Sequence, residues 1–188
     1  MKWNNVKADI KPTSMKDTYG SLTVGDALHI LTTTKYTPFI YFKNDVKKKI
    51  LAHLNTGNTE LGGLLIGSVV ALGELSDNII AINITDSVES VNFESTAVSL
   101  NMNSDVWDHA SKLSNSTNFV VGWYHSHPNL GAFFSATDRK TQRDFFNNKY
   151  SVGLVIDPIR NEECHFLGED SIDIPVSFIK ASHELPLE

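Results

Sequence analysis

The chain changes character near residue 37, where a regular pattern of apolar and polar positions begins. Residues 1–36 show no sustained period, and Ala27–Leu31 is long enough for only one or two helical turns before a break at residues 32–34. From Pro38 onward, apolar runs follow one another at the lengths typical of strands and helices. The pattern predicts an N-terminal extension over residues 1–36 and a single folded domain over residues 37–188.

The first half of this domain begins with a short strand and a helix. Phe39–Phe42 is strand-like, and Asn44 is a suitable cap for an amphipathic helix over Val46–Leu54. Two longer runs rich in β-branched residues follow, Leu61–Val70 and Asn78–Val88, with turn-forming residues between them. We expect these two runs to pair as antiparallel strands.

The second half continues the alternation of strands and helices. Further strands are expected at residues 97–102, 119–124, 152–156 and 164–167, with helices beginning near Ser104 and at Ser135. Because strands and helices interleave, the sequence predicts an α/β (α+β) fold with a mixed, mostly antiparallel β-sheet flanked by helices.

Composition narrows the classes of partner. The chain has 16 basic and 22 acidic residues and a net charge of −6, which disfavours nucleic acid because a phosphate backbone would be repelled. The basic run Lys47–Lys49 is typical of a solvated helix face. No apolar stretch approaches the roughly 20 residues that span a bilayer, and the N-terminus lacks the apolar core of a secretory signal. We therefore expect a cytoplasmic protein with no membrane contact.

The single cysteine, Cys164, excludes an intrachain disulfide and a cysteine-rich zinc site. The histidines offer a different metal chemistry. His125 and His127 lie two residues apart in an extended segment, so their side chains point to the same face and can bind one ion. Asp138 stands at the start of the next helix, within reach across a glycine-containing loop. Two imidazoles and one carboxylate leave a fourth position open on a tetrahedral Zn²⁺, as in catalytic zinc sites.

Two further residues are candidates for the chemistry at such a site. Glu60, just before a predicted strand, is a candidate general acid/base for a water that attacks an amide. Ser135 could donate its hydroxyl to the oxyanion that develops on the carbonyl. Ser135-x-x-Asp138 also matches a helix capping box, in which both side chains satisfy backbone N–H groups. The two interpretations of Ser135 are compatible.

The complete string is His-Ser-His-Pro from His125, six further residues, and Ser-x-x-Asp from Ser135, with a glutamate upstream. This string resembles the JAMM family of metalloproteases, also called the active MPN domain, and the likeness covers about residues 38–168. The resemblance implies a cytidine-deaminase-like catalytic domain over residues 37–188. It also implies one Zn²⁺ per chain held by His125, His127 and Asp138, with Glu60 moving the proton and Ser135 stabilising the tetrahedral intermediate.

The same resemblance implies the class of substrate. The family removes ubiquitin, ubiquitin-like or sulfur-carrier proteins from their conjugates or trims their C-termini, so the expected partner is such a protein with a flexible C-terminal tail. The segment between Asp157 and Cys164 is too short for the insertion that selects ubiquitin linkages in eukaryotic members. The chain therefore resembles compact prokaryotic members, some of which are encoded beside conjugating-enzyme relatives.

Two other functions remain open at this point. One is a non-catalytic MPN-type interaction scaffold, and the other is a peptidase of the same chemistry that acts on an adduct between a carrier protein and an amino acid. The family also binds the substrate tail along the segment before its second helix. Here that segment is about residues 93–101, with Ser95, Thr96, Ala97, Val98 and Ser99 as candidate contacts. The alternative is an ordinary strand buried in the sheet.

Overall fold

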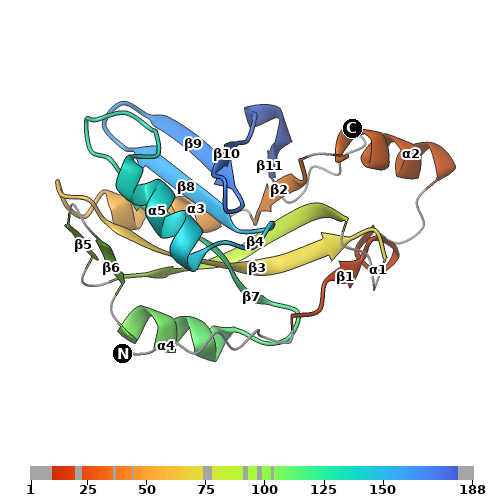
Figure 1. Cartoon of the computed structure of the whole chain (residues 1–188), viewed down its shortest axis with the longest axis horizontal. Coiled ribbons are helices and arrows are strands. Elements are labelled where there is room, and N and C mark those ends of the chain that lie inside the picture. The colour runs from red at the N-terminus through yellow and green to blue at the C-terminus, as the bar shows by residue number, and fades with distance from the viewer. Residues whose placement is uncertain are drawn as a thin grey trace.

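A nine-stranded mixed sheet organises the chain in the computed structural model (Figure 1). The structure describes residues 10–19, 23–35, 37–43, 45–73, 78–90, 93–96, 99–102 and 104–181. The strands of the sheet are β1 (Thr13–Ser14), β2 (Phe39–Phe42), β3 (Gly62–Ala71), β4 (Ile79–Glu89), β7 (Phe119–Ser126), β8 (Val152–Asp157), β9 (Glu162–Leu167), β10 (Ile172–Asp173) and β11 (Ile179–Ala181). β5 (Phe93–Thr96) and β6 (Ser99–Met102) form a separate two-stranded sheet.

The helices are α1 (Met15–Tyr19), α2 (Val24–Thr33), α3 (Val46–Leu54), α4 (Ser104–Leu113) and α5 (Ala136–Phe145), with a 3-10 turn at Val176–Phe178. α5 connects β7 to β8, and these two strands are parallel, so the connection has to cross over one face of the sheet. None of the helices in the described ranges combines the length and the apolarity needed to cross a membrane.

The sheet runs in the order β10-β9-β8-β7-β3-β4-β2-β11, with β1 beside β3. β3 pairs antiparallel with β4 on one side and with β7 on the other, as expected for the two long runs. The β2–β4 and β7–β8 pairings are parallel. The predicted mixed sheet flanked by helices is therefore confirmed.

β3 is buried on both faces because helices cover both sides of the sheet centre. On one face, Ile50 and Leu54 of α3 belong to the same apolar cluster as Leu65. On the other, Val106 and Ala110 of α4 pack in a cluster with Leu64, Ile66, Trp123 and Phe146. Neighbouring β3 residues thus belong alternately to the two clusters. This is the two-residue period expected of a strand that is packed on both faces.

The N-terminal segment differs from its predicted description. α2 is longer than the one or two turns expected, and it continues through Thr32, so the predicted break there is wrong. The Thr32 hydroxyl donates to the carbonyls of Leu28 and His29, which accommodates threonine within a helix. Ile30 of α2 is buried against β2 residues, and β1 pairs with β3. The division at residue 37 stays a prediction.

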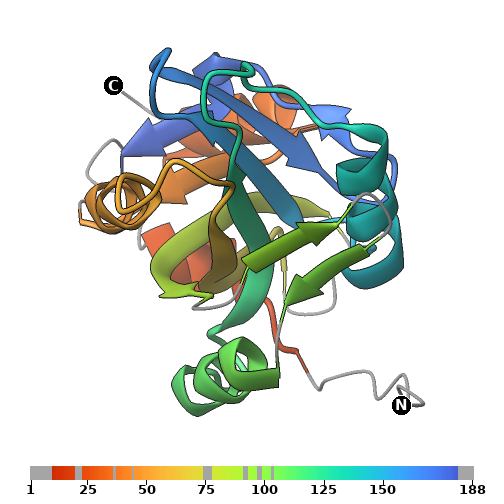
Figure 2. The ribbon, with the colours of Figure 1, turned by 90° about the vertical axis from the view of Figure 1, so that its left-hand side faces the viewer.

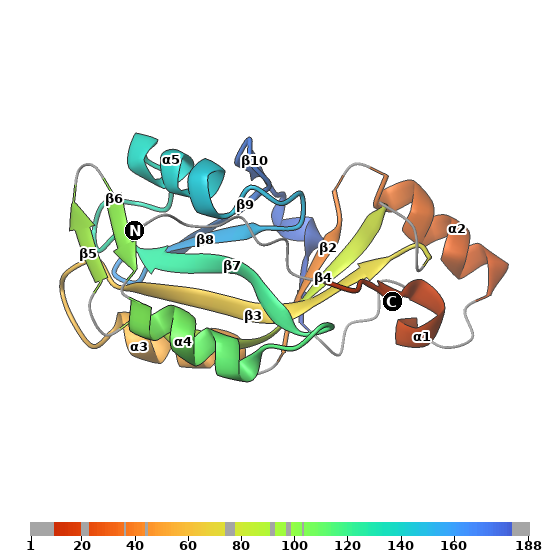
Figure 3. The same cartoon turned by 60° about the horizontal axis from the view of Figure 1, so that its bottom comes forward.

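The predicted strand at residues 97–102 also needs correction. The structure has β6 over Ser99–Met102, paired antiparallel with β5, which the sequence analysis did not identify. Ala97 and Val98 lie outside the described residues. The β5–β6 pair makes no ladder with the nine-stranded sheet, so β6 is not a strand of that sheet. In Figures 2 and 3 the pair stands beside α5, and β6 contacts that helix.

His165 on β9 is a buried titratable group away from the predicted metal ligands. Its side chain is 2% exposed, its ring lies edge-on to Phe42, and neither ring nitrogen has a hydrogen-bond partner among the described residues. Burial lowers the pKa of His165 from 6.5 to about 4, with Glu163 acting in the opposite direction and Lys47 in the same one. The folded protein is therefore more stable with His165 neutral than with His165 protonated.

This burial predicts a specific pH dependence of stability. Because the unfolded chain binds the proton more readily, the contribution of neutral His165 is complete above pH 6.5 and is lost as the pH falls towards 4. The loss should be on the order of 3 kcal/mol. The free energy of unfolding, measured by urea titration between pH 7 and pH 4, should therefore fall less in His165→Leu than in the wild type. His109→Leu, which changes an exposed histidine, should follow the wild-type curve; equal slopes for all three proteins would contradict the expectation.

Candidate metal centre

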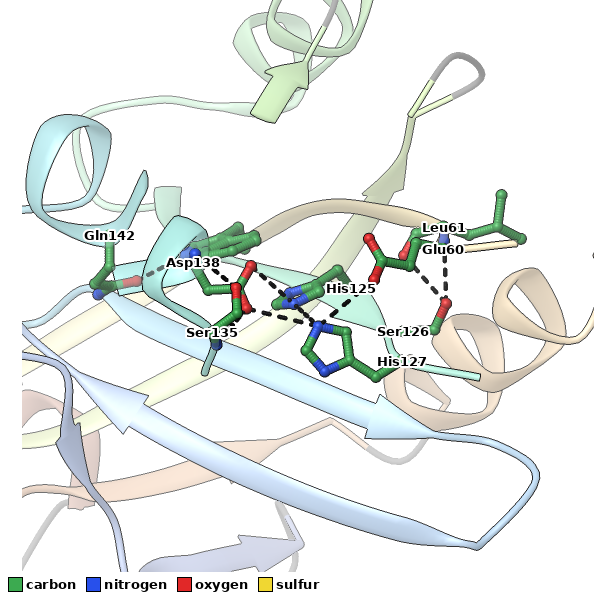
Figure 4. Close-up of polar contacts among 9 residues, drawn as sticks. Glu60, Leu61, His125, Ser126, His127, Ser135, Asp138 and Gln142 are labelled. Atoms are coloured by element: carbon green, nitrogen blue, oxygen red, sulfur yellow. Dashed lines mark hydrogen bonds and ion pairs between the residues drawn. The ribbon is translucent and has the colours of Figure 1, made fainter. Parts of the chain in front are cut away.

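Strand β7 supplies two imidazoles to one point. His125 lies on β7 and His127 directly follows it, and their Nε2 atoms are 3.2 Å apart (Figure 4). The parallel ladder to β8 continues past the strand end, because the His127 N–H donates to the Ile156 carbonyl. This bond keeps residues 125–127 extended, so the two side chains share one face as predicted. Both histidines are buried, 1% and 4% exposed.

Helix α5 supplies the carboxylate. Ser135 caps the helix: its Oγ accepts the Asp138 N–H at 3.2 Å, and its own N–H donates to Asp138 Oδ2 at 2.7 Å. The capping box expected from Ser135-x-x-Asp138 is thus present. It also orients the Asp138 side chain, whose Oδ1 lies 3.2 Å from His125 Nε2 and whose Oδ2 lies 3.6 Å from His127 Nε2.

These separations fit a tetrahedral ion. A zinc with bonds of 2.0–2.1 Å to nitrogen and oxygen has ligand atoms about 3.3 Å apart along each tetrahedral edge. The two Nε2 atoms are 3.2 Å apart, and each has a carboxylate oxygen of Asp138 nearby, Oδ1 at 3.2 Å from His125 and Oδ2 at 3.6 Å from His127. The three residues also form a buried group that could hold a metal ion. The donor types and their spacing therefore suit zinc with one position left open.

Glu60 reaches the site through the pairing of β3 with β7. The antiparallel register aligns Gly62 with His125, and the same alignment continued by two residues sets Glu60 opposite His127. Glu60 Oε1 lies 3.8 Å from His127 Nε2, on the side of the histidines away from Asp138 (Figure 4). Ser126 holds this segment, because its Oγ accepts the Leu61 N–H and its own N–H donates to the Leu61 carbonyl.

The electrostatics favour the protonation states that bind a metal. Burial alone would raise the pKa of Asp138, but the hydrogen bond and charge of His125 and the bonds from Ser135 lower it to about 2. Burial lowers the pKa of His127, and the neighbouring His125 lowers it further. A carboxylate beside a neutral imidazole is the state that a cation requires of its ligands.

A buried carboxylate that the sequence analysis did not single out fixes the loop between the ligands. The Asp157 side chain, at the end of β8, accepts the backbone N–H groups of Asn129, Gly131, Ile159 and Arg160. Burial would raise the pKa of Asp157, but these N–H donors lower it to about 2. Asn129 and Gly131 have positive φ angles of 63° and 92°, so this acceptor supports a loop conformation that most residues disfavour.

The structure brings together five of the predicted site residues: Glu60, His125, His127, Ser135 and Asp138. Of the five candidate substrate contacts, Ser95 and Thr96 lie on β5 and Ser99 lies on β6, whereas Ala97 and Val98 lie outside the described residues. The roles of all these residues stay predictions. Trp123, on the predicted strand at residues 119–124, is fully buried and stacks on His125, a contact that no local pattern indicated.

Comparison with known proteins gives independent evidence on the family of the chain. Residues 40–149 match the sequence profile described as JAB1/Mov34/MPN/PAD-1 ubiquitin protease. The chain is 33% identical over 128 residues to the ubiquitin carboxyl-terminal hydrolase RPN11 of Saccharomyces cerevisiae, a match that covers 65% of this chain and 39% of that protein. It is 33% identical over 122 residues to COP9 signalosome complex subunit 5a of Arabidopsis thaliana, covering 60% of this chain and 31% of that one. The chain thus aligns with well under half of either relative.

A solved structure shares the fold. The protein DSY2949 from Desulfitobacterium hafniense superposes with a TM-score of 0.56, covering 78% of this chain and 95% of that one, at 22% sequence identity. At this identity the likeness concerns the arrangement of strands and helices alone.

Protein purified without chelators should contain about one zinc ion per chain, because two imidazoles and one carboxylate form a typical catalytic zinc set. Elemental analysis measures the content. His127→Ala should lose the metal, whereas His109→Ala, which removes an exposed imidazole on α4, should keep it. A wild-type protein that contains no zinc and takes up none from solution would rule out the assignment.

Proposed function

Because the chain belongs to the JAB1/Mov34/MPN/PAD-1 ubiquitin protease family, we propose that it is a zinc-dependent peptidase or isopeptidase. Its substrates would be conjugates or C-terminal extensions of a ubiquitin-like protein. The observation that carries this proposal is the convergence of His125, His127 and Asp138 at the spacing of zinc ligands, with Glu60 beside them. A Zn²⁺ ion held there would supply a Lewis acid that polarises the scissile carbonyl and lowers the pKa of water.

Glu60 is the group that moves protons in this proposal. Its side chain is 27% exposed, so it can contact both the ligand cluster and incoming solvent. It takes a proton from the attacking water and returns it to the leaving amine, which would otherwise depart as an unstable anion. The Ser126 clamp on Leu61 holds the backbone next to Glu60, which limits how far its carboxylate can move.

Ser135 stabilises the charge that develops on the carbonyl oxygen. Its Oγ accepts the Asp138 N–H, so the helix cap fixes the place of the hydroxyl beside the ligand cluster. A donor fixed by a helix cap does not need to reorganise as the oxyanion forms, which is the condition for effective electrostatic stabilisation. The capping bond therefore supports the catalytic interpretation of Ser135.

The substrate tail docks along β6. β6 contacts α5, the helix that carries Asp138, so an extended tail on the outer edge of β6 would lie near that helix. Such an edge offers main-chain hydrogen bonds to an extended peptide without requiring particular side chains.

The relatives favour the enzyme acting on ubiquitin-like proteins over the scaffold. One of them is named a ubiquitin carboxyl-terminal hydrolase, and all five predicted catalytic and ligand positions are filled here. Incubation with a fluorogenic amide of the ubiquitin C-terminus, and with a panel of other ubiquitin-like and sulfur-carrier conjugates analysed by mass spectrometry, separates the substrates. If the protein cleaves only adducts between a carrier protein and an amino acid, those adducts would be its substrates instead of conjugates of a ubiquitin-like protein. Zinc binding without any cleavage would favour the scaffold.

Glu60→Gln should retain zinc and lose turnover by at least ~10²-fold, because the amide keeps the shape of the side chain and removes the proton acceptor. Turnover is measured on whichever conjugate the panel identifies, and the zinc content on the same sample. Glu89→Gln, which changes an exposed acid at the end of β4, serves as the matched control and should turn over normally. Near-normal turnover in Glu60→Gln would mean that another group is the base.

Proline substitutions in β6 test the docking strand. Successive N–H groups of a strand point to opposite edges, so Ser99→Pro and Leu100→Pro each remove a donor from a different edge of β6. The variant that loses the outer donor should bind zinc normally and show a raised KM for a folded conjugate with little change in kcat. Unchanged KM in both variants would mean that the tail binds elsewhere.

A further inference from the structure

Helix α5 contacts strand β7 through two polar pairs, and only one of them is at the proposed ligand site. His125 Nε2 and Asp138 Oδ1 form the first pair, 3.2 Å apart. The second pair is Trp123 Nε1, which donates to Gln142 Oε1 at 2.6 Å. Trp123 precedes His125 by two residues on the strand, and Gln142 follows Asp138 by four on the helix, so each partner lies on the same face as its neighbour.

The second pair has only one chemically consistent arrangement. Gln142 Nε2 donates to the carbonyls of Ser151, Phe146 and Gly168. Carbonyls accept but cannot donate, so the amide oxygen has to face Trp123, whose indole N–H can only donate. Both side chains are fully buried, so bulk solvent does not reach them to replace a lost partner. The amide therefore cannot flip without leaving buried groups unsatisfied.

The same contact determines the orientation of His125. The Trp123 indole lies parallel to the His125 imidazole, with ring centroids 4.6 Å apart and planes inclined by 6°. Phe146 also stacks on the indole, with ring centroids 5.7 Å apart and planes inclined by 16°, and Phe134 lies beside both rings, 5.5 Å from the indole and 6.0 Å from the imidazole. The lack of a side chain at Gly153 leaves room for this packing, since a Cβ there would come within 2.3 Å of Phe134 Cζ and 3.1 Å of Gln142 Oε1. An indole fixed at its N–H edge is thus a flat support that sets the plane of the imidazole.

We propose that Gln142 is a positioning residue for the metal centre. By accepting the Trp123 N–H, it holds the indole against His125 and holds α5 at the point along β7 where Asp138 and His125 can share one ion. The inference rests on the proposed function in one respect: it takes His125, His127 and Asp138 as the ligands. It goes further in assigning part of the metal affinity to a residue that touches neither the ion nor the substrate.

A purely structural role for Gln142 predicts something different. In that case a substitution would lower the stability of the protein, but the folded fraction would bind the metal as the wild type does. A positioning role predicts weaker and geometrically altered binding in protein that is fully folded. Gln142→Met keeps the length of the side chain and removes the acceptor, and Trp123→Phe keeps an aromatic ring and removes the donor.

The experiment compares these variants by zinc affinity and by cobalt spectroscopy at a temperature where all are folded. Zinc affinity is measured by chelator competition, and the visible spectrum of the Co²⁺-substituted protein reports ligand geometry. Gln142→Met should bind zinc about 10- to 100-fold more weakly than the wild type, with a changed Co²⁺ spectrum, as is typical when the support of a ligating histidine is removed. Thr141→Val, a change at an equally buried neighbour on α5, should behave as the wild type.

A double-mutant cycle tests the route through the indole. If Gln142 acts through the Trp123 N–H, then Gln142→Met should cost much less zinc affinity in the Trp123→Phe background than in the wild type. Equal costs in both backgrounds, or wild-type affinity and spectrum in folded Gln142→Met, would overturn the inference. If Gln142→Met does not fold, Trp123→Phe becomes the test of the inference. An unchanged zinc affinity and Co²⁺ spectrum in Trp123→Phe would then overturn the inference. A wild-type protein without zinc affinity would instead overturn the proposed function.

Discussion

The antiparallel register between β3 and β7 is the constraint on which the site depends. It places Glu60 opposite His127, because Gly62 is aligned with His125 and the alignment continues to the strand ends. A slip by one residue would turn the Glu60 side chain to the other face of the sheet. The irregularity in this pairing lies between Leu65 and Ile66, away from the site. Near the site, Ser126 binds both backbone groups of Leu61 and holds the register where it matters.

Burial makes this arrangement suitable for a cation. His125, His127 and Asp138 are at most 4% exposed, and polar atoms brought so close without water are unfavourable unless each finds a partner. A carboxylate and two imidazoles share too few hydrogens to satisfy one another fully. A divalent ion would resolve the conflict, because all three groups could then direct lone pairs at one positive charge. The fold holds the three groups close through the helix cap and the strand ladder, so the ion does not have to assemble the site alone.

The sequence predicts those parts of the molecule whose residues interact locally. β7 and α5 are identified within two residues, since aromatic and β-branched residues mark the strand and Ser135 marks the helix start. The ligand set follows from spacing on these two elements. Glu60 can be named but not placed, because its position depends on a pairing about 65 residues away along the chain. β5, β10 and β11 are missed because short strands gain their order from partners rather than from their own pattern. Asp157 and Gln142 look like ordinary surface residues until the fold buries them.

The proposed metal site tolerates only a small shift of α5 along β7. One residue of helix advances the axis by about 1.5 Å and turns it by about 100°. A slide of that size is nearly half of the roughly 3.3 Å that separates two ligands of a tetrahedral zinc. The loop before the helix is fixed by the Asn129 and Gly131 N–H groups, which donate to Asp157, and the second turn is fixed by Gln142. Asp138 lies between these two attachments. A helix held at only one of them could still fold against the sheet, but its carboxylate would no longer be confined to the place that the two histidines require.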